Sequence, residues 1–99
     1  MIVQRITTRY KVGKAQEAIS LLKETLKRSQ EQGHFTGVVR FYTPRHISDM
    51  AVGEYEFEST SAMEQFWAYW ETFPEAQEFG RKYSPLRESG MTFEIFDVA

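Results

Sequence analysis

The sequence predicts an α+β domain whose elements follow the order β-α-β-β-α(α)-β. Three observations carry this prediction: helical spacing of apolar residues, segments rich in β-branched and aromatic residues, and turn residues between them. The 99 residues fit a single domain, which we expect to span residues 1–99.

The first half of the chain supplies three strands and one helix. Residues 2–10 are rich in Ile, Val, Thr and Tyr and predict a first strand. Residues 15–32 predict an amphipathic helix, because their apolar side chains recur on one face, and Gly33 suits its C-terminal end. Residues 35–42 and 50–57 predict the second and third strands.

The next helix is strongly aromatic. Residues 66–73 hold five aromatic side chains, including both tryptophans of the chain. At 100° per residue, the large side chains fall within a stripe of roughly 160°, wide enough either for a thick core or for one wall of a cleft. Ser61 with Glu64 forms one candidate cap for this helix, and Ser59 is the competing cap.

The last two elements complete the plan. A third helix is predicted from Pro74 to about Tyr83, because proline fits the first turn of a helix. Gly90 then leads into a last strand over residues 91–98. This order is the ferredoxin-like plan, an antiparallel sheet with helices on one face.

Period-two alternation sorts the strand residues into two faces. One largely apolar set is expected to face the helices: Ile2, Gln4, Ile6, Thr8, Tyr10, Gly37, Val39, Phe41, Ala51, Gly53, Tyr55, Phe57, Met91, Phe93 and Ile95. The other face mixes arginines and glutamates with apolar residues such as Val38 and Phe96. A second sheet packed there explains the mixture better than solvent, so we predict a homodimer through this face. The candidate interface residues are Arg5, Arg9, Arg40, Tyr42, Glu54, Glu56 and Glu94.

Composition argues against several classes of function. A net charge of −2 without a basic cluster argues against nucleic acid as a partner, and Glu54 and Glu56 argue against an RNA-recognition domain of the same order. No apolar run is long enough for a membrane span. No signal peptide is visible, and the lack of cysteine fits a cytoplasmic protein. Neither His34 nor His46 has a partner at ligand spacing, so we expect no metal site.

Three segments carry a resemblance to known proteins. Residues 3–8 with Gly13-Lys14, residues 55–66 and residues 73–77 resemble the dimeric α/β-barrel superfamily, and within it the NIPSNAP-like and antibiotic-biosynthesis-monooxygenase-like domains. The resemblance implies two ferredoxin-like sheets paired face to face in a homodimeric barrel. It also implies a pocket between the helices and the sheet of each subunit.

The same resemblance bears on haem chemistry. The haem-degrading members of this superfamily use an Asn, a Trp and a His, and at the matching positions this chain has Gln4, Phe66 and Gln77. Glutamine is a poor iron ligand compared with imidazole. We therefore expect neither haem degradation nor a bound cofactor, and carry over only the location of the pocket.

Several polar residues stand on faces that otherwise build core. Such groups need partners when buried, so they are either the hydrogen-bonding groups of a pocket or are satisfied by one another and by the backbone. The candidate pocket residues are Gln4, Thr8, Tyr55, Phe66, Trp70, Gln77 and Phe93. None is a good base at neutral pH, so no catalytic residue is assigned.

Two functions stay open at this point. The first is a protein that binds a small apolar or aromatic molecule and is related to cofactor-independent monooxygenases, which rely on a reactive substrate. The second is a non-catalytic binding or protein-interaction domain of the same fold.

Overall fold

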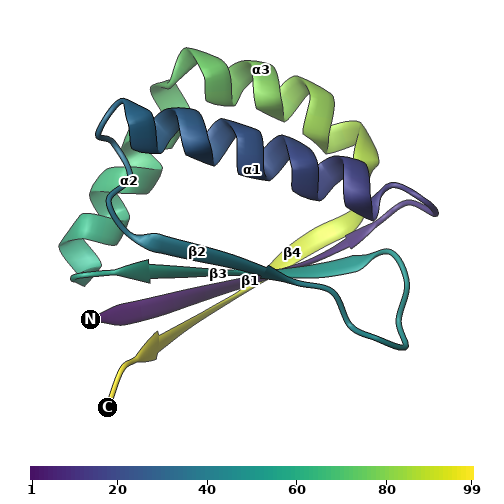
Figure 1. The fold of residues 1–99 in the computed structure, drawn as a ribbon, viewed down its shortest axis with the longest axis horizontal. Helices are drawn as coiled ribbons and strands as arrows, with labels where there is room; N and C mark the ends of the chain where they lie inside the picture. Colours follow the sequence, from purple (N-terminus) through teal and green to yellow (C-terminus); the bar gives the residue numbers. More distant parts are fainter.

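Four antiparallel strands form one sheet in the order β2-β3-β1-β4, and the helices lie on one of its faces (Figure 1). The computed structural model describes residues 1–99. The elements are β1 (Ile2–Tyr10), α1 (Ala15–Glu31), β2 (Val38–Tyr42), β3 (Met50–Phe57), α2 (Thr60–Thr72), α3 (Pro74–Tyr83), the 3₁₀ turn η1 (Ser84–Leu86) and β4 (Arg87–Asp97). The ferredoxin-like prediction is confirmed.

The central strand β1 pairs with β3 on one side and with β4 on the other. Ile6 lies opposite Gly53 of β3 and opposite Phe93 of β4. The pairing with β4 is regular up to Thr8 and then shifts, so that Tyr10 pairs with Arg87. Such a bulge bends a strand and strengthens its twist. Here the bulge places Arg87 directly opposite Tyr10 on the neighbouring strand.

Two strand boundaries differ from the prediction. β4 begins at Arg87 rather than at residue 91, because the bulge accommodates Gly90 within the strand. β2 begins at Val38 rather than at residue 35. A Cβ at Gly37 would lie 1.9 Å from the backbone oxygen of Glu56, so only glycine allows this close approach.

Local signals explain the helix ends. Gly33, with a φ of 78°, follows the last turn of α1. The Oγ of Ser59 accepts a hydrogen bond from the backbone N–H of Ala62 at 3.1 Å, so Ser59 rather than Ser61 caps α2. Pro74 begins α3, where its missing N–H leaves no hydrogen bond unmade.

The core consists of two clusters on the helix side of the sheet. The first, which we call the closed core, comprises Ile2, Ile6, Leu26, Phe35, Tyr55, Phe57, Met63 and Phe66. The second comprises Tyr10, Ala18, Ile19, Ala51, Phe79, Tyr83 and Leu86. Trp70 packs against both clusters, so it lies where the two meet.

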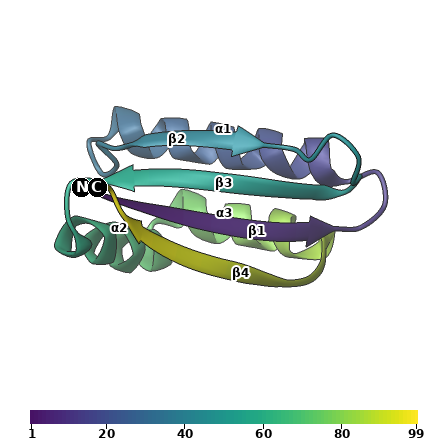
Figure 2. The same ribbon diagram turned by 90° about the horizontal axis from the view of Figure 1, so that it is seen from below.

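The predicted division into faces agrees with the register, which places Phe93 beside the helix-facing Ile6, but burial differs from strand to strand. On β1 and β3 the helix-facing residues are buried, as expected. On β4, Met91, Phe93 and Ile95 are exposed. Figure 2 gives the reason: α1 lies behind β2 and α3 behind β1, so the helices leave the β4 edge largely uncovered.

No helix combines the length and the apolar character needed to span a membrane. The cytoplasmic location stays a prediction.

Candidate functional site

A cavity of about 420 Å³ lies between the helices and the sheet. This volume falls within the usual range for small-molecule sites. Twelve of its 18 lining residues are hydrophobic. The lining consists of Gln4, Ile6, Thr8, Tyr10, Leu22, Phe41, Ala51, Gly53, Tyr55, Trp67, Trp70, Glu71, Phe79, Tyr83, Ser84, Arg87, Met91 and Phe93.

Aromatic side chains from α2 and α3 form the helical wall. Trp67 and Trp70 are three residues apart on α2, so they project from the same side of the helix. The Trp70 ring lies edge-on to Phe79 of α3 with 5.6 Å between centroids. Phe79 stacks on Tyr83 one turn later, at 4.6 Å. The contacts continue from α2 to the end of α3 and make this wall continuous.

Small residues on β3 lie opposite that wall. Ala51 and Gly53 face the helices on the same side of β3 as Tyr55 and Phe57. A Cβ at Gly53 would lie only 3.0 Å from the Tyr55 ring and 3.3 Å from Phe41. The aromatic rings therefore pack against the backbone here, and the strand contributes little side-chain volume to the cavity.

Gln4 presents hydrogen-bond donors to the cavity. The indole Nε1–H of Trp67 donates to Oε1 of Gln4 at 2.6 Å, and this bond determines which end of the amide is oxygen. Gln4 is only 6 % exposed, and its one side-chain hydrogen bond is the one that Oε1 accepts from Trp67. Its two N–H groups are thus free to bind an acceptor on a ligand.

Two tyrosines of the cavity, Tyr10 and Tyr55, stay neutral. Burial raises the pKa of Tyr55 far above its usual value of 10. Burial and a hydrogen bond with Tyr83 do the same for the pKa of Tyr10, and the two hydroxyl oxygens lie 2.7 Å apart. At physiological pH neither residue is a tyrosinate, so each can donate a hydrogen bond and neither can act as a base.

One arginine reaches the cavity from the beginning of β4. Arg87 is partly buried, and its guanidinium carbon lies 5.8 Å from the centre of the Tyr83 ring. Its Nε is buried and has no hydrogen-bond partner. No carboxylate lies within 4.0 Å of its guanidinium. This end of the cavity therefore holds a positive charge without a counter-ion.

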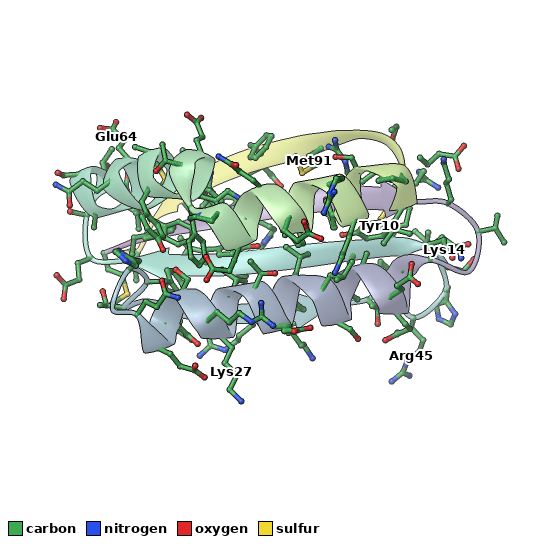
Figure 3. The ribbon with its side chains drawn as sticks, turned by 90° about the horizontal axis from the view of Figure 1, so that it is seen from above. Tyr10, Lys14, Lys27, Arg45, Glu64 and Met91 are labelled. Atoms are coloured by element: carbon green, nitrogen blue, oxygen red, sulfur yellow. The ribbon has the colours of Figure 1, made fainter.

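The cavity opens at the β4 edge. Its exposed lining residues are Glu71, Ser84, Met91 and Phe93. Figure 3, seen from the helix side, places Met91 beside α3, where no further helix covers the strand. A ligand can enter between α3 and β4 without unfolding any element.

The structure brings most of the predicted pocket residues together. Gln4, Thr8, Tyr55, Trp70 and Phe93 all line the cavity. Phe66 does not, because it is buried in the closed core against Phe35 and Phe57. Gln77 does not either, because it lies on the exposed side of α3, whose buried face is Ala76, Phe79 and Tyr83.

Other lining residues were not among the sequence candidates. Tyr10 belongs to the set expected to face the helices, and Tyr83 is expected at the end of the third helix. Arg87 lies in the segment that the prediction left between the last helix and the last strand. Extending the alternation of Met91 and Phe93 back along the chain would have placed Arg87 on the same side.

The opposite face of the sheet carries the predicted charges in ordered rows. The register aligns one row across all four strands, in the order Arg40, Glu54, Arg5 and Glu94. Arg5 forms an ion pair with Glu54, and Arg40 with Glu56, each at 3.0 Å. The hydrogen bond to Glu56 raises the pKa of Arg40. Tyr42 lies on this face opposite Val52, and Arg9 is exposed at the far end of β1.

The histidines lie outside the cavity. His34 stacks on Tyr69 with 3.7 Å between ring centroids, and His46 is exposed in the loop between β2 and β3. No group of three or more His, Asp or Glu residues is placed to hold a metal ion.

Known structures share this architecture. No family model matches the sequence, and no curated protein does. An uncharacterised NIPSNAP domain protein from Burkholderia xenovorans has 18 % identity and a TM-score of 0.81, covering 100 % of this chain and 95 % of its own. A NIPSNAP family protein from Agrobacterium tumefaciens has 18 % identity and a TM-score of 0.80, and the match covers 99 % of this chain and 92 % of that protein. An antibiotic biosynthesis monooxygenase has 10 % identity and a TM-score of 0.76, and the match covers 100 % of this chain and 99 % of that protein.

These similarities extend over nearly the whole of each chain. At such low identities they concern the fold. The chain has the ferredoxin-like fold of NIPSNAP domains and antibiotic biosynthesis monooxygenases, and the resemblance seen in the sequence is confirmed at that level.

Proposed function

We propose that this protein binds a small, largely apolar or aromatic molecule in the cavity between its helices and its sheet. The observation that carries the proposal is the cavity itself, about 420 Å³ of space with an aromatic wall and unpaired hydrogen-bond donors on Gln4 and Arg87. Well-packed interiors seldom leave voids larger than a water molecule. Apolar walls with a small number of placed polar groups are typical of ligand sites.

Calorimetric titration with 2-naphthol tests this proposal. We expect saturable binding to the wild-type protein. An Ala51→Leu variant, which adds volume inside the cavity, is expected to lose at least about tenfold in affinity, equivalent to about 1.4 kcal/mol. The matched control is Ala68→Leu on the exposed side of α2, which should bind like the wild type. Equal binding by both variants, or no saturable heat with the wild type, contradicts the proposal.

We further propose that the protein works as a homodimer whose sheets pack face to face. The row Arg40, Glu54, Arg5 and Glu94 alternates in charge. A two-fold axis parallel to the strands reverses the strand order of the second copy. Arg40 then lies over Glu94 and Arg5 over Glu54, so each charge meets its opposite. An axis perpendicular to the strands would place like charges together.

Apolar residues on the same face support this packing. Val38, Tyr42 and Phe96 are each more than 40 % exposed in the single chain, and a second sheet would cover them. Charge alternation supplies the register, and the apolar residues supply most of the favourable free energy.

Light scattering at micromolar concentration tests the dimer. We expect twice the monomer mass for the wild type. Arg40→Glu should shift the mass toward the monomer, because residue 40 would then lie over Glu94. Adding Glu94→Arg in the same chain restores an alternating contact and should restore the dimer. A monomeric wild type, or a single variant that dimerises as well as the wild type, refutes this packing.

An oxygenase activity is the catalytic extension of the proposal. Neither Tyr10 nor Tyr55 can act as a base, and the one carboxylate of the lining, Glu71, is exposed. The oxygenase we propose would therefore need a substrate that is reactive by itself, as an electron-rich phenol is. The protein would contribute shape, removal of water and hydrogen-bond donors. Oxygen uptake with such a phenol, compared between wild type and Ala51→Leu, separates an oxygenase from a binding domain. No uptake above the rate in buffer leaves binding as the function.

A further inference from the structure

We propose that the natural ligand is an amphipathic anion, with an apolar body against the aromatic wall and a carboxylate held by Arg87. This inference rests on the binding function proposed above and specifies the chemistry of its ligand. It starts from the one cation of the cavity, which reaches the site from the beginning of β4.

Arg87 has the features of a binding residue rather than of a structural ion pair. Four other arginines form ion pairs with a glutamate at 3.0 Å or less, and each of these arginine side chains is more than 40 % exposed. Arg87 has no carboxylate partner, and its Nε is buried without an acceptor. Leaving a buried donor unsatisfied costs roughly 1 to 3 kcal/mol, and more for a charged group. The terminal N–H groups of the guanidinium have no protein acceptor either and are not buried, so an acceptor on a ligand can reach them.

The surroundings hold the guanidinium in place before any ligand arrives. It lies 5.8 Å from the centre of the Tyr83 ring, a distance suited to a cation–π contact. Tyr83 is itself held by a 2.7 Å hydrogen bond to Tyr10 and by stacking on Phe79. Arg87 is paired with Tyr10 across the sheet, so its backbone is also fixed. Preorganisation of this kind lowers the entropy lost on binding.

The chemistry of the lining selects a carboxylate on an apolar body. A planar guanidinium matches a carboxylate with two parallel hydrogen bonds. The next part of the cavity offers Trp70, Phe79 and Met91, which suit an aromatic or aliphatic body. The second charged lining residue, Glu71, is exposed and makes no ion pair with Arg87. Gln4 lies six residues from Tyr10 along β1, roughly 20 Å away, so it would bind a different part of a longer ligand.

A matched pair of probes tests the inference. 2-Naphthoate and 2-naphthamide have nearly the same shape and differ in charge, and calorimetry at low ionic strength measures both. We expect the wild type to bind the carboxylate at least about tenfold more tightly than the amide. Arg87→Gln should remove this preference while changing the affinity for the amide by less than about threefold.

The control for charge is Arg45→Gln. Arg45 is exposed in the loop between β2 and β3, on the far side of α1 from the cavity opening (Figure 3), and this variant should keep the preference. Arg87→Lys keeps the charge but loses the planar fork, so it should keep only part of the preference. Circular dichroism verifies the fold of each variant. If Arg87→Gln does not fold, the comparison of the two probes on the wild type and on Arg87→Lys remains decisive.

The possible outcomes separate the two proposals. Equal affinity of the wild type for both probes refutes the anionic ligand and leaves the cavity as a binding site. A preference for the carboxylate that persists in Arg87→Gln refutes Arg87 as its anchor. Failure of both probes to bind refutes the proposed function as well.

Discussion

The helix α2 contributes aromatic side chains to two regions that differ in packing, the closed core and the cavity wall. At one end, Phe66 contacts Phe35 at 4.9 Å and Phe57 at 5.9 Å between ring centroids, within the closed core. At the other, Trp70 and Phe79 form a wall with empty space beside them. The same kind of side chain builds a core in one place and a cavity in the other.

The difference comes from what lies opposite. Along one face of β3 the side chains shrink from Phe57 and Tyr55 to Gly53 and Ala51. Large rings opposite large rings fill the layer between sheet and helices, whereas Ala51 and Gly53 line the cavity on the side opposite Trp70. The comparison teaches that aromatic content does not identify a binding site. The missing volume opposite it, together with the unpaired donors of Gln4 and Arg87, is what makes the cavity the candidate site.

The largest expected effect is the difference in stability lost when a phenylalanine is truncated in the closed core and at the cavity opening. Phe66→Ala removes a fully packed ring and should lower the free energy of unfolding by about 3 to 5 kcal/mol. Phe93→Ala removes the same atoms from a residue that is 55 % exposed at the cavity opening, and should cost less than about 1 kcal/mol. Urea unfolding measures both. Equal losses would mean that the β4 edge is as well packed as the closed core.

The next effect concerns Tyr55, which belongs to both regions, since it contacts Phe35 and lines the cavity. An unfolded tyrosine loses its proton near pH 10, whereas burial keeps Tyr55 protonated in the folded protein. Above pH 10 the folded state therefore binds more protons than the unfolded state. Stability is complete below pH 10 and should then fall as pH rises, by about 1.4 kcal/mol per pH unit for this group.

Tyr10 acts in the same direction, because its pKa is also raised. Urea unfolding at a series of pH values measures the combined slope, and a Tyr55→Phe variant should reduce it. An unchanged slope in that variant would show that Tyr55 ionises with the solvent-exposed tyrosines.

The smallest effect concerns the cap of α2, the helix that contributes side chains to both regions. Ser59→Ala removes the hydrogen bond to the N–H of Ala62 and should cost about 1 kcal/mol of stability. Ser61→Ala is the matched control and should change stability by less than about 0.5 kcal/mol. Because the cap lies outside the cavity, neither variant should change ligand affinity per folded molecule. If Ser61→Ala lowers stability more than Ser59→Ala does, then Ser61 rather than Ser59 caps α2.

Local patterns were sufficient for most of the fold. The bounds of β1, β3 and α3 follow from alternation, composition and Pro74, because these signals depend only on neighbours along the chain. The beginning of β4 was missed because a bulge depends on the partner strand, which local sequence does not specify.

The site was predictable only in part, for a related reason. Alternation identified Gln4, Thr8 and Tyr55 as helix-facing polar residues. It could not tell which of the adjacent aromatics Phe66 and Trp67 would face the cavity, because that depends on how α2 is rotated against the sheet. The empty volume arises from the spacing between layers, and no single segment encodes that spacing.

The central claim is that a ligand occupies the cavity beside Trp70, and nitrogen–proton correlation NMR tests it most directly. The chain has two tryptophans and both line the cavity, so the spectrum has two indole N–H signals, which a Trp70→Phe variant assigns. During titration with 2-naphthoate we predict that the Trp70 signal shifts and saturates while the backbone signals of the exposed side of α1 stay in place. If neither indole signal moves at saturating ligand, the cavity is not the binding site.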